Sequence, residues 1–174
     1  MKTNKKDLQI GKLIGIKVGE FNFAIYSVAY LMLNKNMSLD KALDFLPYND
    51  ELKNELYKYL ENIDSFDNLD DIVDEVFDTY EEDYKNNEYL KFQKIFSEDY
   101  NINFTIDEIK QFHSGETDEY RKGKISGLKE GMINIAIINT KFLINYKNLG
   151  LKDALNYFPY SKQVVTEVSN YFKS

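Results

Sequence analysis

The sequence has no cysteine, only one histidine and only two prolines. Without cysteine the chain has no disulfide framework, no thiol nucleophile and no thiolate ligand for a metal. A single histidine, His113, excludes most zinc clusters, and any Ser-His-Asp triad would have to use it. Ser114 follows it directly, but adjacency in sequence does not supply the geometry of a triad. We therefore expect no catalytic residue, no metal site, no cofactor and no enzymatic activity.

Long apolar runs are also scarce. The most apolar stretch, FNFAIYSVAYLML at 21–33, has 13 residues, which is too short to cross a membrane and suits a buried helix. The basic start, MKTNKKDLQIGKL, leads into no apolar run with a small-residue cleavage site. With 174 residues, 43% of them hydrophobic, the chain can build the core of one compact domain. We expect a cytoplasmic protein that makes no contact with a membrane.

Charge is unevenly spread along the chain. The formal net charge is −7, but residues 61–121 alone carry nineteen acidic and five basic side chains, for −14. Residues 1–60 carry +2 and residues 122–174 carry +5. Such asymmetry between segments indicates that the acidic centre and the two flanks have different roles.

The two flanks are copies of one another. A shift of 112 residues aligns 11–60 with 123–172 without a gap, and about a third of the positions are identical. The only two prolines, Pro47 and Pro159, fall at equivalent positions. We expect helical repeat 1 at 1–60, an acidic helical insertion at 61–121 and helical repeat 2 at 122–174.

Each repeat is expected to contain three helices. The first spans about 8–33, or about 121–146 in the second copy, and is apolar almost all round. Ser38 can cap a short second helix, LDKALDFL, and a proline ends that helix. Asp50 and Ser161 can cap the third helix of the respective copies. In LDDIVDEVFDTYEEDY the apolar residues also keep helical spacing, and the sequence predicts an all-α fold.

Six of the eight glycines form two ladders with a four-residue spacing. They are Gly11, Gly15, Gly19, Gly123, Gly127 and Gly131. Glycine inside a helix costs about 0.8–1.0 kcal/mol relative to alanine, so three in one ladder need a compensating contact. Because residues four apart share a helix face, each ladder offers a groove into which another backbone can fit. We expect the ladders to pack on one another or on a second chain; they match no phosphate-binding motif.

One family resemblance accompanies these ladders. A glycine ladder, an apolar helix and then MSLDKALDFL resemble the C-terminal tails of the Rpn (recombination-promoting nuclease)/putative transposase family, most closely in RKGKISGLKEGMINIAI. The resemblance covers 11–60 and 123–172. The nuclease core of that family is not found here, although 51–53 and 108–110 supply an isolated E-x-K, so no catalytic residue carries over. The resemblance implies an association or regulatory module.

The acidic centre contains a run of carboxylates at helical spacing. It comprises Asp70, Asp71, Asp74, Glu75, Asp78, Glu81, Glu82 and Asp83. No Asp-x-Asp-x-Asp-Gly loop is present to gather them around calcium, so the run is either a solvated helix face or a docking surface for a basic partner. Tyrosine and phenylalanine occur mostly at helical core spacing, and the third helix of repeat 1 is acidic. Both features disfavour direct binding of nucleic acid.

These observations lead to one leading hypothesis and two alternatives. The leading hypothesis is a non-enzymatic protein-binding module. It would act as a small acidic inhibitor or regulator of a nuclease or defence effector, with carboxylates occupying a basic groove made for nucleic acid. The first alternative is a structural scaffold that forms homo-oligomers, in which the acids only confer solubility. The second is a small-molecule-binding protein or small enzyme with a pocket between the repeats.

Overall fold

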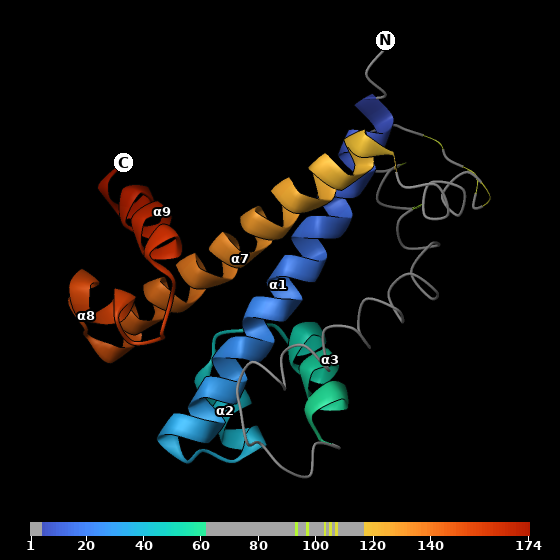
Figure 1. The fold of residues 1–174 in the computed structure, drawn as a ribbon. Helices are drawn as coiled ribbons and strands as arrows, with labels where there is room; N and C mark the ends of the chain where they lie inside the picture. The colour runs from blue at the N-terminus through green and yellow to red at the C-terminus, as the bar shows by residue number, and fades with distance from the viewer. Residues whose placement is uncertain are drawn as a thin grey trace.

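The computed structural model describes residues 5–61 and 117–174, and between them only the single positions 93, 97, 103, 105 and 107. The helices of 5–61 and 117–174 form two sets of three, one before and one after this interval (Figure 1). They are α1 (Lys5–Lys35), α2 (Leu39–Phe45), α3 (Asp50–Leu60), α7 (Asp118–Lys147), α8 (Leu151–Leu155) and α9 (Lys162–Lys173). The described residues contain no strand, so the prediction of an all-α fold is confirmed.

The helix ends follow local signals in the sequence. Ser38 caps α2 by accepting a hydrogen bond from the backbone N–H of Lys41, and Ser161 caps α9 in the same way, as predicted. The prediction for α3 is wrong by one residue. Asn49 accepts the bond from the backbone N–H of Leu52 at 2.8 Å, and Asp50 is the first residue of the helix. There its carboxylate still faces the positive end of the helix dipole.

Both long helices end on asparagine in the left-handed conformation. Asn36, just after α1, has φ 52°, and Asn148, just after α7, has φ 53°. Asparagine tolerates this backbone better than most residues because its side chain bonds locally. The turn allows the backbone N–H of Met37 and Leu149 to close onto the last turn of each helix. Each repeat thus folds back at the same point, and its short helices lie beside the C-terminal part of its long helix (Figure 1).

The helices α1 and α7 start at the same end of the molecule and run side by side in the same direction (Figure 1). All six ladder glycines are buried at their crossing. A Cβ at Gly11 would come closer than 3.0 Å to the carbonyl oxygen of Tyr120, and one at Gly123 would meet the carbonyl oxygen of Leu8 in the same way. The two backbones therefore touch, and a side chain at these positions has no space.

The crossing is reciprocal along its whole length. Gly15 lies against the carbonyl of Lys124, and its counterpart Gly127 lies against the carbonyl of Lys12. Each of these contacts maps onto the other by the 112-residue shift between the repeats. The α1–α7 pair thus has the form of a two-fold dimer built within one chain.

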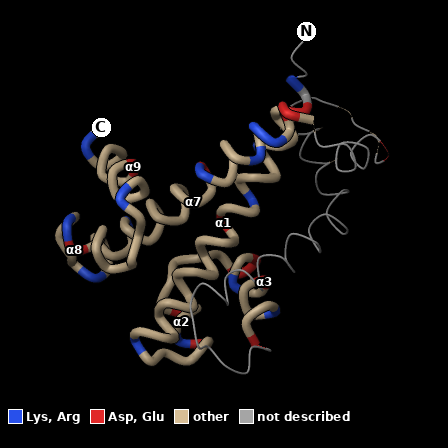
Figure 2. The backbone as a smooth tube through the Cα atoms, viewed as in Figure 1, with Lys and Arg blue, Asp and Glu red and all other residues tan. Residues whose placement is uncertain are grey.

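Below the crossing, each repeat packs its turn against the long helix of the other. The turn after α8 lies on α1, where Tyr26 donates a hydrogen bond to the carbonyl of Pro159 and Phe23 stacks on Tyr160 at 5.3 Å. The residues of this core are fully or almost fully buried; among the largest are Phe21, Ile25, Leu31, Leu46, Leu56 and Phe158. From 21 to 34 α1 carries no charged residue, which Figure 2 shows as a tan stretch.

Candidate functional site

The acidic run predicted as the partner-binding surface, 70–83, lies outside the described residues, as do His113, Ser114 and the E-x-K at 108–110. The other E-x-K, at 51–53, lies in the first two turns of α3, where no strand positions it. Within 5–61, 117–174 and the five isolated positions, no three carboxylate or histidine side chains gather as a metal site would require. No helix in this part of the protein is long and apolar enough to cross a membrane.

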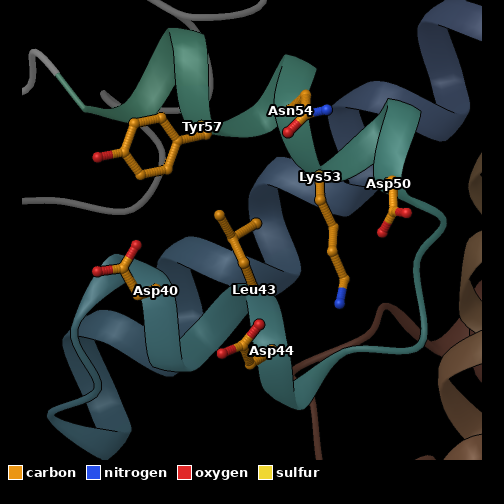
Figure 3. A pocket seen from close by; sticks show the side chains of 7 residues that line it. All are labelled: Asp40, Leu43, Asp44, Asp50, Lys53, Asn54 and Tyr57. Atoms are coloured by element: carbon orange, nitrogen blue, oxygen red, sulfur yellow. The ribbon is translucent and has the colours of Figure 1, made fainter.

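A groove of about 520 Å³ opens between α2 and α3 (Figure 3). Its rim carries three exposed carboxylates, Asp40 and Asp44 from α2 and Asp50 from the start of α3. Leu43 lies between the two helices, and Lys53 extends from α3 toward α2 in Figure 3. Asn54 and Tyr57 complete the lining. The groove is therefore an open, acidic surface with an apolar base.

The same place in repeat 2 has different chemistry. The positions equivalent to the three carboxylates are Lys152, Asn156 and Lys162. The other lining residues Lys53, Asn54 and Tyr57 become Val165, Thr166 and Ser169. Only the leucine at the base is kept, as Leu43 and Leu155, and it is buried in both repeats. The repeats therefore share their packing here while the exposed charge changes from acidic to basic.

Two of the three carboxylates, Asp40 and Asp50, lie in the first turns of α2 and α3, where the helix dipole favours a negative charge. All three are exposed and none caps a helix, since the caps of α2 and α3 are the neighbouring Ser38 and Asn49. A repeat of the same design folds with lysine and asparagine in their place. Exposed carboxylates above an apolar base can bind the ammonium or guanidinium of Lys or Arg while Leu43 contacts the aliphatic stem.

A second group of polar residues is buried where the repeats meet. Asn139 of α7 donates to the hydroxyl oxygens of Ser27 at 3.0 Å and Tyr160 at 3.2 Å, and Ser27 donates to a carbonyl one turn back in α1. Burial raises the pKa of Tyr48, and Ser27 and Asn139 offset only part of that shift. Burial likewise raises the pKa of Tyr160, against a smaller lowering by Asn139. Burial therefore favours the neutral phenols in this cluster.

Aromatic rings and lysines meet on the surface near the ends of the long helices. Phe45 stacks on Tyr157 at 6.1 Å between ring centroids, and these two residues are equivalent in the repeats. Lys35 lies 5.2 Å above the ring of Tyr157, and Lys147 lies 4.7 Å above that of Phe45. Cation–π contacts of this kind contribute about 0.5–1 kcal/mol each at exposed sites. The contacts are reciprocal and join the repeats rather than create a pocket.

Our sequence interpretation did not single out the α2–α3 groove. A signal for it was nonetheless present in the aligned repeats, because core positions agree where the exposed positions reverse their charge, as at Asp40 and Lys152. The interpretation instead placed the partner surface in the acidic run, on which the described residues do not bear.

Comparisons with known proteins add no family to this picture. No family model, no curated protein and no solved structure matches the chain. The resemblance to the tails of the Rpn family therefore stays a prediction. The described residues have an all-α fold in which two three-helix repeats interlock.

Proposed function

We propose that this chain is a non-enzymatic module that binds a protein partner with a basic surface. One observation carries the proposal: the α2–α3 groove presents Asp40, Asp44 and Asp50 where the matching surface of repeat 2 presents lysine and asparagine. Repeat 2 folds with lysine and asparagine at these positions, so the exposed carboxylates of repeat 1 are available for contact with a partner. An acidic surface of this kind accelerates encounter with a basic partner and orients it.

The acidic run at 70–83 extends the proposal beyond the groove. Its carboxylates supply most of the excess negative charge of the protein. A partner that normally holds nucleic acid has a basic groove, and carboxylates at helical spacing can occupy positions made for phosphates. We therefore favour an inhibitor or regulator of a nuclease or defence effector, of the antitoxin or anti-defence type, acting in the cytoplasm.

The test is capture of the partner from lysate of the native host by tagged full-length protein, at low and high salt. We expect one stoichiometric protein that is released as salt rises. We expect at least tenfold less of it on the variant Asp40→Asn/Asp44→Asn/Asp50→Asn. A matched control, Lys152→Gln/Lys162→Gln, changes the equivalent positions of repeat 2 and should leave capture unchanged.

A second variant separates the two acidic surfaces. Asp74→Asn/Glu75→Gln/Asp78→Asn/Glu81→Gln removes charge from the run alone. Loss of the partner on this variant and not on the groove variant would move the binding surface to the run. If both variants capture the partner as well as wild type does at every salt concentration, an electrostatic partner surface is contradicted altogether.

One observation supports the alternative of an oligomerising scaffold. Tyr146, near the end of α7, is 75% exposed and stacks on Phe142 at 5.4 Å. The exposed ring of Tyr146 can bury further area against another molecule. Self-association without any captured partner, weakened by Tyr146→Ser, would favour the scaffold over the inhibitor.

A further inference from the structure

The two halves of the chain, 5–61 and 117–174, bury one another rather than two separate cores. Repeat 2 places Tyr160 and Phe158 against α1, and repeat 1 places Phe45 against Phe142 of α7 at 5.6 Å. The buried Asn139 of one half bonds to Ser27 of the other. Each half therefore lacks part of its interior until the other is present.

Contacts at the rim of the crossing favour the pairing of a first half with a second half over the pairing of two first halves or two second halves. Lys12 of α1 forms an ion pair with Glu130 of α7 at 2.8 Å. By the equivalence of the repeats, a pair of α1 helices would set Lys12 against Val18 instead. Likewise Asn134 donates to Glu20 at 3.2 Å, whereas a pair of α7 helices offers methionine in place of that carboxylate. The surface of the first half thus fits a second half, whichever chain supplies it.

We propose that two copies of this chain exchange halves to form a closed dimer. The first half of each chain pairs with the second half of the other through the same glycine crossing, ring stacks and Ser27–Asn139 bond. Because each pair would keep the contacts described above between 5–61 and 117–174, exchange would expose no apolar surface at this interface. The partner is a second copy of this chain, so the inference goes beyond the proposed function and does not depend on it.

Protein concentration during refolding decides between the folded single chain and the dimer with exchanged halves. Tethering gives the halves of one chain an effective concentration on the order of millimolar or below, so dilute refolding favours the single chain and concentrated refolding favours exchange. Once formed, either form converts slowly, because conversion separates the buried backbones at the crossing and the rings below it.

The experiment uses two full-length variants that are each damaged in a different half. Gly15→Leu forces a side chain into the backbone of Lys124, and Gly127→Leu forces one into the backbone of Lys12. Refolded together, with distinguishable tags, the two chains still hold one intact first half and one intact second half. We expect a mixed dimer with twice the 20.5 kDa chain mass, by co-purification and light scattering.

The matched control refolds Gly15→Leu together with Gly19→Leu. Both changes lie in α1, so no intact first half exists and we expect at least tenfold less mixed dimer. Equal yields from the two mixtures would overturn the proposal. If the variants precipitate, wild-type chains with two tags are refolded together from dilute to millimolar protein. A mixed dimer that increases with concentration supports exchange, and monomer throughout overturns it.

Discussion

At the scale of single residues, the buried tyrosines make the stability of this protein sensitive to alkaline pH. Tyr48 is buried, and the hydroxyl of Tyr160 reaches the buried Asn139. Burial raises the pKa of both phenols in the folded chain above the value of about 10 that they have when unfolded. A raised pKa in the folded state stabilises the fold below the unfolded pKa, and that contribution is lost as pH rises above it.

We therefore expect stability to fall between pH about 10 and 12, by about 1.4 kcal/mol per pH unit for each buried tyrosine. Tyr48→Phe removes the ionisable group and should flatten this decline by that amount. The slope of urea unfolding free energy against pH is the measurement, since the substitution also changes the stability at neutral pH. Tyr146→Phe, at a 75% exposed ring, is the control and should leave the slope as it is. A Tyr48→Phe slope identical to wild type would contradict the burial of that hydroxyl.

At the scale of elements, the sequence predicts most of the helices because their signals are local. Ser38 and Ser161 mark the starts of α2 and α9 through their own side chains. In repeat 1, Pro47 follows closely after the end of α2. The error at α3 arises because Asn49 and Asp50 are both good caps and only the backbone conformation decides between them. The long helices also extend one to three residues beyond their predicted ends, and α7 begins at Asp118 with Thr117 as its N-cap.

The start of α7 depends on a contact between the halves that local signals do not reveal. Thr117 accepts a bond from the backbone N–H of Tyr120 at 3.2 Å and donates to the buried carboxylate of Asp7 at 2.8 Å. Because Thr117 and Asp7 are 110 residues apart in the sequence, the pattern of either helix alone does not predict this hydrogen bond.

Thr117→Val should destabilise the protein by about 2–4 kcal/mol. The change removes the cap, worth about 1 kcal/mol, and leaves the buried carboxylate of Asp7 without its donor, at a further 1–3 kcal/mol. Chemical unfolding measures it. The comparison is Ser161→Ala, which removes only a cap and should cost about 1 kcal/mol. Equal losses for the two variants would contradict the link between Thr117 and Asp7.

At the scale of the whole molecule, the duplication predicts the two-fold form of the fold but not the groove between α2 and α3. The ladders are visible as a pattern because their spacing repeats within each copy. The Ser27–Asn139 bond is hidden, since two unlike residues at equivalent positions meet only once the helices are paired. The reversal of charge between Asp40 and Lys152 is visible in the aligned repeats, but the groove itself is not, because Asp40 and Asp50 line one surface only when α2 folds against α3.

The backbone contact between α1 and α7 joins the two repeats. The helices α2 and α3, which form the groove of repeat 1, pack on α1, and the α1–α7 contact is the interface that exchange between chains would reuse. The substitution Gly127→Ala tests this contact most directly because two effects of opposite sign compete. Helix propensity alone would stabilise the protein by about 1 kcal/mol, whereas a Cβ driven into the backbone of Lys12 should destabilise it.

The measurement is the free energy of unfolding of Gly127→Ala beside that of Ser126→Ala, its exposed neighbour on α7. We predict that Gly127→Ala loses about 1–3 kcal/mol, the usual range for overfilling a packed interior, while Ser126→Ala is neutral or slightly stabilising. A Gly127→Ala protein as stable as wild type or more stable would contradict the crossing.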